Sequence, residues 1–261
     1  MFKELIFATR LGPMRADIEL VPDTEPVVFL HGMFLNKSIW QQYRSELTDK
    51  THIYIDMPSH GDNPLLDSRW TQADAVGAIL DCLKKLSVKR CTLVGHSWGA
   101  ITALQIAYEH PALVSALGLF NMPTKSPDLK QRFEFKVQKL LGFLPGIYAD
   151  IFAKTCFSPD FLLRHPRLIA TLRQEMQKRS PKSIARLLDV IESSARGLMK
   201  KLFTIHAPVI MVNGVSDKTV NHDYAVLAEL VTLRSAPGGH VSPLEGRGMT
   251  VQVIQELAKK T

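Results

Sequence analysis

Short runs of consecutive apolar residues recur through the first half of the chain and again near its end. Such runs are typical of strands in a parallel sheet, because helices bury both faces of these sheets. The pattern predicts six strands, at 27–30, 52–56, 91–94, 116–120, 208–212 and 231–233. Helical periodicity lies between them, as at 38–47, 71–86 and 100–108. Alternating strands and helices favour βαβ units and therefore a mostly parallel sheet.

This alternation stops at residue 123 and resumes after residue 203. Apolar residues within the interval fall on single helical faces: Leu129, Phe133, Val137 and Leu140; Leu168, Ile169, Leu172 and Met176; Ile184, Leu187, Leu188 and Ile191. Pro166 and Pro181 stand where two of these helices would begin. The sequence therefore predicts a core domain formed by residues 1–122 and 204–261, with residues 123–203 inserted as an all-helical cap, or lid.

Composition excludes several classes of protein. Of the 261 residues, 46% are hydrophobic and 22% charged, which does not fit a disordered tail, a coiled coil or a collagen repeat. Three cysteines are too few for a disulfide framework, and no pair has the spacing of a zinc site. No run approaches the ~20 apolar residues that cross a bilayer, and Glu4 interrupts the N-terminal run, unlike a secretory signal. We expect a cytoplasmic protein.

The positive charge belongs to the predicted cap. The chain carries a net charge of +7, and residues 125–201 alone contain 16 basic and 7 acidic side chains. Solvated helix faces are the default explanation. Attraction of an anionic substrate, such as a carboxylate or an acyl thioester carrying phosphates, is a second, and docking to an acidic membrane surface is a third. No motif indicates nucleic-acid binding.

The strongest chemical signal is the sequence G-H-S-W-G at 95–99, centred on Ser97. It follows the strand at 91–94 and opens the helical segment 100–108. A nucleophilic serine needs such a sharp strand-to-helix turn, and the two glycines are required because side chains there would collide with the neighbouring strand or helix. The amides at the start of the new helix favour a developing oxyanion. The context predicts that Ser97 is a nucleophile.

A nucleophilic serine needs a base and an acid that orients the base. Asp217 lies in a loop just after the predicted strand 208–212, where ligand sites of open α/β sheets cluster. His240 lies between glycine-rich residues and Val241 in the loop after the last strand. The order Ser97, Asp217, His240 is the order that this type of nucleophile turn requires.

Other residues compete for these two roles. Asp223 is an alternative acid, but it falls where a helix is expected, so Asp217 is preferred. Nine histidines compete for the role of base. Three of them, His31, His60 and His96, lie in loops near the predicted site, yet none follows the last strand.

A two-donor oxyanion hole is predicted beside the nucleophile. The glycine in L-H-G-M-F at 30–34 lets the chain turn after a buried strand, so that the Met33 amide can face Ser97 together with the Trp98 amide. The candidate substrate-binding side chains flank these groups: His31, Phe34, Trp98 and Val241.

These motifs resemble the α/β-hydrolase superfamily. The resemblance includes H-G-M-F, D-M-P-S-H-G at 56–61, G-H-S-W-G, V-S-D-K-T-V and G-G-H-V-S-P-L-E, and it covers nearly all of the chain outside the cap. It is greatest for the compact branch of esterases and carbon–carbon-bond hydrolases, whose lid follows the sixth strand. It implies a mostly parallel eight-stranded sheet with helices on both faces, a triad of Ser97, Asp217 and His240, and Met33 and Trp98 as oxyanion donors. Dehalogenase and epoxide-hydrolase relatives carry an Asp at the position of Ser97.

The sequence therefore predicts a serine hydrolase that cleaves an ester or thioester of a small or medium acyl substrate through an acyl-enzyme. No metal or organic cofactor is expected. Two alternatives stay open: the same triad could cleave a carbon–carbon bond in a vinylogous diketone, or the scaffold could be a slow-turnover small-molecule receptor. Four cap aromatics could line the substrate slot or pack onto the core: Phe133, Phe152, Phe157 and Phe161. The sequence does not indicate the oligomeric state.

Overall fold

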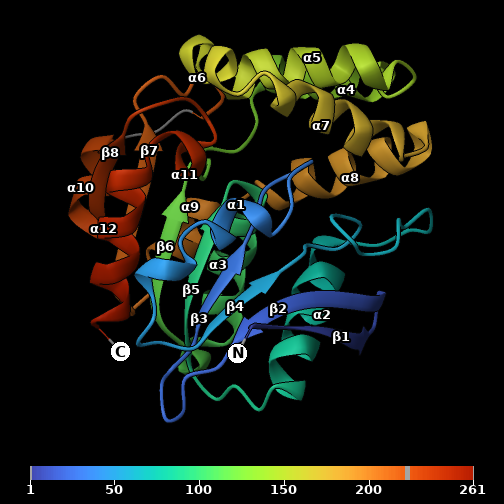
Figure 1. Ribbon diagram of the computed structural model, residues 1–261. Helices are drawn as coiled ribbons and strands as arrows, with labels where there is room; N and C mark the ends of the chain where they lie inside the picture. Colours follow the sequence, from blue (N-terminus) through green and yellow to red (C-terminus); the bar gives the residue numbers. More distant parts are fainter. Residues whose placement is uncertain (1, 221–223, 261) are drawn as a thin grey trace.

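One eight-stranded sheet forms the centre of the computed structural model, which describes residues 2–220 and 224–260 (Figure 1). The spatial order is β1-β2-β4-β3-β5-β6-β7-β8, and the strands from β4 to β8 run parallel. Their bounds are β1 Phe2–Thr9, β2 Gly12–Glu19, β3 Val27–Leu30, β4 His52–Ile55, β5 Cys91–His96, β6 Val114–Phe120, β7 Val209–Gly214 and β8 Thr232–Ala236. The predicted fold class is confirmed, and all six predicted strands are present.

Helices cover both faces of the sheet. On one face lie α2 (Gln72–Lys85) and α3 (Trp98–Glu109); on the other lie α1 (Ser38–Gln41), α11 (Ser242–Glu245) and α12 (Arg247–Ala258). The short α10 (Tyr224–Leu230) adjoins β8. Helix α2 begins with the predicted capping box, in which the Thr71 hydroxyl accepts from the Asp74 amide and the Asp74 carboxylate accepts from the Thr71 amide.

Two local features differ from the sequence-based expectation. The β1–β2 hairpin is not among the apolar runs, because it extends the sheet in antiparallel fashion and its strands mix apolar residues with polar ones such as Arg15, Asp17 and Glu19. The single helix expected at 38–47 is wrong. Helix α1 ends at Gln41 and a 3₁₀ turn follows at Arg44–Glu46, where the fully buried Tyr43 directs its hydroxyl to the Pro243 carbonyl.

Between β6 and β7 the chain is helical throughout, as predicted, and we call residues 123–203 the helical insert. Its helices are α4 Leu129–Leu141, α5 Pro145–Cys156, α6 Pro159–Arg164, α7 Arg167–Gln177, α8 Pro181–Ser194 and α9 Leu198–Leu202. Helix α4 packs on α5 and α8, and α5 packs on α7. Most of the insert lies over the carboxyl ends of the parallel strands (Figure 1), whereas α9 packs on α3. Treating residues 123–203 as a separate domain stays a prediction.

Candidate active site

Ser97 occupies a strained turn between β5 and α3. Its φ is +52°, a left-handed conformation that non-glycine residues rarely adopt. Its amide donates to the Phe120 carbonyl at 2.8 Å, and its carbonyl accepts from the Ile101 amide at 3.0 Å. These bonds hold both sides of the turn, so the hydroxyl has a fixed position at the end of β5.

The glycines on either side of Ser97 are required by close backbone approach. A Cβ on Gly95 would lie 2.4 Å from the Gly99 carbonyl oxygen. A Cβ on Gly99 would lie 2.4 Å from the Leu30 carbonyl oxygen, at the end of β3. The turn therefore packs directly against its own helix and against the neighbouring strand, as the motif predicts.

The structure brings Ser97, His240 and Asp217 together. His240 Nε2 lies 2.9 Å from Ser97 Oγ, and His240 Nδ1 lies 2.9 Å from Asp217 Oδ2. Because the carboxylate accepts the Nδ1 proton, Nε2 carries a lone pair directed at the serine hydroxyl. The Asp217 side chain is only 1% exposed. The alternative acid Asp223 lies outside the described residues.

Three neighbours hold Asp217 in its ionised form. Asn121 Nδ2 donates to Oδ2 at 2.7 Å, and the Thr219 amide and hydroxyl both donate to Oδ1 at 2.8 Å. Burial alone would raise the pKa of Asp217, but His240, Asn121 and Thr219 together hold this pKa far below its usual range. The acid therefore stays negative over the whole range in which an imidazole titrates.

Thr219 also contacts the imidazole. Its Oγ1 lies 2.6 Å from His240 Nδ1. Since the hydroxyl proton is donated to Asp217, the threonine oxygen acts as an acceptor, and the Nδ1 proton is shared between Thr219 and Asp217. Asp217, Thr219 and His240 thus form a closed triangle of hydrogen bonds.

Sequence reasoning missed both Asn121 and Thr219. Asn121 follows β6 directly, is completely buried and has a φ of +49°. Besides its bond to Asp217, its Oδ1 accepts from the Ser242 hydroxyl at 2.5 Å. A polar residue immediately after a buried strand that neighbours both β5 and β7 is a usable signal for Asn121. For Thr219, the usable signal is its place two residues after a loop aspartate.

The loop after β3 passes directly beside the nucleophile. A Cβ on Gly32 would lie 3.2 Å from Ser97 Cβ. Trp98 is the first residue of α3, where helical amides lack partners within the helix. Among the described residues, neither the Met33 amide nor the Trp98 amide has a hydrogen-bond acceptor. Both amides therefore retain the donor that an oxyanion hole needs.

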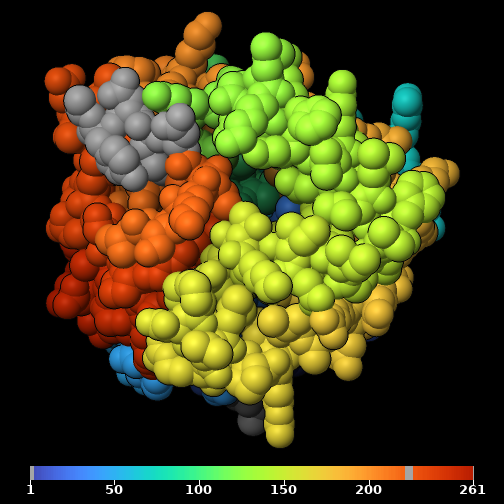
Figure 2. Space-filling view, turned by 90° about the horizontal axis from the view of Figure 1, so that it is seen from above, coloured from blue at the N-terminus to red at the C-terminus, as the bar shows by residue number. Residues whose placement is uncertain are grey.

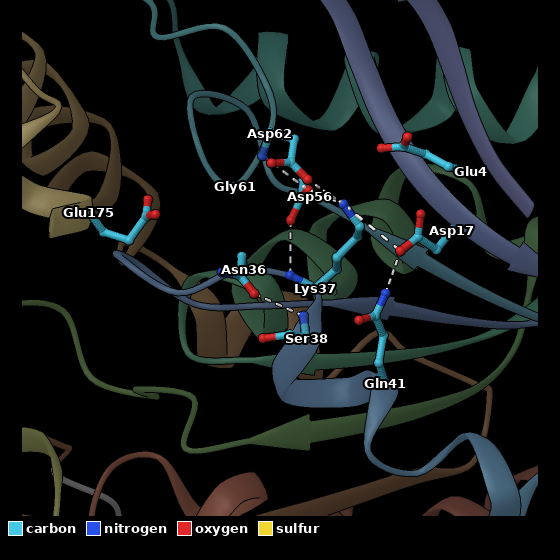
Figure 3. A pocket seen from close by; sticks show the side chains of 10 residues that line it. All are labelled: Glu4, Asp17, Asn36, Lys37, Ser38, Gln41, Asp56, Gly61, Asp62 and Glu175. Atoms are coloured by element: carbon cyan, nitrogen blue, oxygen red, sulfur yellow. Dashed lines mark hydrogen bonds and ion pairs between the residues drawn. The ribbon is translucent and has the colours of Figure 1, made fainter. Parts of the chain in front are cut away.

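A buried ion pair between Lys37 and Asp56 holds the loop that follows β3 (Figure 3). Asp56, which is fully buried, accepts from the Lys37 amide at 2.9 Å and from Lys37 Nζ at 2.7 Å, and Asp62 accepts from the same ammonium group at 3.1 Å. These groups line a polar cavity of about 490 Å³ together with Glu4, Asp17 and Glu175. No set of three or more metal-ligating side chains occurs among the residues that the structure describes.

The three competing histidines are all buried away from the serine hydroxyl. His31 accepts from the Met57 amide at 2.9 Å, and His96 bonds the His240 carbonyl at 2.8 Å. Burial lowers the pKa of His31 to about 4 and that of His96 to about 3, and it places the pKa of His60 well below 6.5. At neutral pH these three imidazoles are uncharged and form part of the loop packing. His240 differs from them because its Nε2 lies within hydrogen-bonding distance of Ser97 Oγ.

The four candidate substrate-binding residues have at most 1% of their surface exposed. His31 and Val241 are completely buried, and Phe34 packs under the insert against Tyr148 and Phe152. The Trp98 indole N–H donates to Gln72 at 2.7 Å, so its ring belongs to the core beneath the turn. The structure therefore places these side chains in the packing around the site.

The cap aromatics divide into two groups. Phe152, Phe157 and Phe161 are buried. Phe133 is 65% exposed, so the prediction that it lines the slot or packs onto the core is wrong. The reason is that the apolar face of α4 points outward, away from the sheet.

A sheet of this topology with a serine at this turn is the architecture of an α/β hydrolase. A profile described as the alpha/beta hydrolase family matches residues 27–250, and the chain belongs to this family.

Solved structures share the fold over nearly the whole chain. An enol-lactonase from Burkholderia xenovorans has a TM-score of 0.87 at 16% identity, with 98% of this chain and 100% of that chain covered. An esterase from Thermogutta terrifontis has a TM-score of 0.82 at 19% identity, with 99% and 98% covered. At these identities the similarity concerns the fold alone.

Curated relatives match shorter segments. An sn-1-specific diacylglycerol lipase of Xenopus tropicalis is 36% identical over 92 residues, which are 34% of this chain and 28% of the relative. A putative carbamate hydrolase of Variovorax paradoxus is 30% identical over 142 residues, or 53% of each chain. The chain thus matches about half or less of the length of these relatives.

Because these histidines are buried in the neutral form, we expect the free energy of unfolding to decrease in weak acid. An unfolded histidine gains a proton near pH 6.5, whereas folded His31 stays neutral down to about pH 4, so protons favour the unfolded state between these values. We expect His31 to lower the free energy of unfolding by about 2 kcal/mol between pH 8 and pH 5. Urea unfolding of wild type and His31→Gln at both pH values measures this difference. The control His206→Gln, at an exposed histidine, should keep the wild-type pH dependence; an equally steep loss in His31→Gln would contradict the prediction.

Proposed function

We propose that this protein is a serine hydrolase that cleaves a carboxylic ester or thioester of a small or medium acyl substrate through a covalent acyl-enzyme. The observation that carries the proposal is the continuous hydrogen-bond chain from Asp217 through His240 to Ser97 Oγ, with both links at 2.9 Å. The two unpartnered amides beside the serine supply the second requirement of acyl transfer.

The geometry supports the following reaction. Ser97 Oγ attacks the carbonyl carbon while His240 Nε2 takes its proton, and Asp217 stabilises the imidazolium that forms. The amides of Met33 and Trp98 donate to the oxyanion of the tetrahedral intermediate. The intermediate collapses as His240 protonates the leaving alcohol or thiol. Water then attacks the acyl-enzyme by the same route and releases the carboxylic acid, which regenerates the Ser97 hydroxyl.

The position of the helical insert also supports the proposal, because most of the insert lies over the end of the sheet that carries Ser97. Helix α5 places Phe152 against Phe34 at a ring-centroid distance of 5.4 Å, and its last residue, Cys156, accepts from the Val241 amide at 3.2 Å. Helix α5 therefore contacts both the loop after β3, which contains Met33 and which we call the oxyanion loop, and the loop after β8, which contains His240. We propose that the insert is a lid whose displacement admits substrate and whose closure excludes water.

Replacing Ser97 by alanine tests the nucleophile. We expect Ser97→Ala to lose ester hydrolysis by at least about 10⁴-fold and to resist labelling by a fluorophosphonate, because no other hydroxyl contacts His240 Nε2 among the described residues. Intact-mass spectrometry gives the labelling stoichiometry, and circular dichroism gives the fold. Ser235→Ala, at an exposed serine on β8, is the matched control and should be labelled like wild type. Full labelling of a folded Ser97→Ala protein would refute the assignment.

Thr219 is predicted to be a positioning residue. We expect Thr219→Val to lower kcat about tenfold with little change in KM, because it removes a hydrogen bond to a charged carboxylate and an acceptor at His240 Nδ1. Thr219→Ser keeps the hydroxyl and should recover most of the rate. Steady-state kinetics across pH 5 to 9 should also show a displaced acid limb for Thr219→Val alone. Equal losses in both variants, with unchanged pH profiles, would indicate a packing role only.

The bond that is cleaved is tested by a hydrolysis panel. Acyl esters of increasing chain length, matched acyl thioesters and a lactone are assayed with wild type and Ser97→Ala. Turnover of an open-chain ester, a thioester or the lactone, which is a cyclic ester, supports the proposal if it requires Ser97, and the panel shows which class is preferred. No turnover of any of them, or turnover that Ser97→Ala retains, would overturn the substrate assignment.

A further inference from the structure

The apolar face of α4 points away from the protein. Its residues Leu129, Phe133, Val137 and Leu140 are spaced i, i+4, i+8 and i+11 and are 85%, 65%, 38% and 69% exposed. The opposite side of the helix packs inward through the half-buried Phe135. An amphipathic surface helix normally buries its apolar stripe, so this arrangement is reversed.

The same surface continues through the α4–α5 turn onto α5. Phe143 and Leu144 in the turn are 70% and 53% exposed, and Ile147 and Ile151 on α5 are 53% and 44% exposed. The two helices pack against each other and lie side by side in the view from above (lime green in Figure 2). We call these eight side chains, four on α4 and four on the turn and α5, the outer insert face. Singly exposed apolar residues are common, whereas such a set marks an interaction surface.

Positive charge accompanies this surface. Arg132 and Lys136 are exposed on α4 next to the apolar stripe, and Lys154 is exposed on α5. Residues 125–156 carry a net charge of +3, and residues 125–201 carry +9, while the rest of the chain is slightly negative. A second copy docked face to face would bring these like charges together, so charge complementarity favours an anionic partner.

We propose that the outer insert face docks onto an anionic lipid surface. Large apolar side chains flanked by lysine and arginine have the composition of helices that lie in a membrane interface, where the rings and aliphatic groups enter the acyl boundary and the cations meet lipid phosphates. Within the described residues no helix is long and apolar enough to cross a bilayer. The contact is therefore one of helices lying on the lipid.

The position of the surface relates it to the candidate active site. Helix α5 contributes Ile147 and Ile151 to the outer insert face, while Tyr148 and Phe152 on its other side pack on Phe34 of the oxyanion loop. In Figure 2, a hollow lies between the lime-green part of the insert and the orange part of the chain that follows the insert, with atoms of earlier chain segments at its floor. Docking would thus place the opening of the molecule against lipid.

Vesicle co-sedimentation of the full chain tests the proposal without reference to activity. The probe is extruded vesicles of phosphatidylcholine containing 30% phosphatidylglycerol, compared with pure phosphatidylcholine. We expect binding to the anionic vesicles that weakens at 0.5 M salt and is at least about tenfold lower on neutral vesicles. We expect Phe133→Ser/Leu140→Ser to lower the bound-to-free ratio about tenfold, because both side chains leave the acyl boundary.

Matched controls are available on other surfaces. Phe203 and Leu20 are 57% and 66% exposed outside the outer insert face, so Phe203→Ser/Leu20→Ser removes similar apolar side chains and should bind like wild type. Lys136→Glu/Lys154→Glu should reduce binding to anionic vesicles. Lys84→Glu/Lys89→Glu, at exposed lysines on α2 and just before β5, should not.

Three results would overturn the proposal. The first is no binding of folded wild type to anionic vesicles. The second is equal loss of binding in the Phe133/Leu140 and Phe203/Leu20 variants. The third is a dimer in light scattering that Phe133→Ser/Leu140→Ser converts to a monomer, which would make the surface a contact between copies of this chain.

Discussion

The backbone turn at Ser97 is the constraint on which the site depends. A serine at a φ of +52° is strained, and such a conformation persists only when its surroundings determine it. Here the Phe120 carbonyl holds the Ser97 amide, and Gly95 and Gly99 let the turn approach its own helix and β3 more closely than any side chain would allow. The rigidity matters because the hydroxyl must meet the His240 imidazole, which belongs to a loop 143 residues further along the chain.

Electrostatics then distinguish one histidine from the others around it. Burial keeps His31, His60 and His96 neutral, and for His31 it outweighs the opposing effect of Asp56, whose Oδ1 lies 3.6 Å from His31 Nε2. These imidazoles form hydrogen bonds with neighbouring loops. Of these four histidines, only His240 accepts a hydrogen bond from the Ser97 hydroxyl, at Nε2, and donates one to the Asp217 carboxylate, from Nδ1. The carboxylate stays ionised despite its burial because His240 itself, together with Asn121 and Thr219, lowers the pKa of Asp217. The proposed chemistry thus depends on residues outside the hydrogen-bond chain of Ser97, His240 and Asp217.

The sequence predicted those parts of the structure that local pattern determines. Continuous apolar runs identified the buried parallel strands, and loop positions after strands identified Ser97, Asp217 and His240, which the structure brings together. Features set by tertiary neighbours were missed. Asn121 reaches Asp217 because β6, which it follows, lies between β5 and β7 in the sheet. The end of helix α1 at Gln41 follows from the burial of Tyr43. Periodicity placed Leu129 and Phe133 on one helical face, but it could not indicate that this face points outward.

The helical insert is apolar both on the side that faces the core and on part of the side that faces outward. A lid over the ester-cleaving site that we propose must be apolar on its inner side to exclude water, and an ordinary surface helix is then polar on its outer side. Helix α5 is apolar on both sides, with Phe152 inward and Ile151 outward, and it borders the reversed α4. Leaving so much apolar surface in water is unfavourable for an isolated molecule. The arrangement becomes favourable if the outer side is covered by lipid, since a substrate dissolved in that lipid could then reach the site without crossing water.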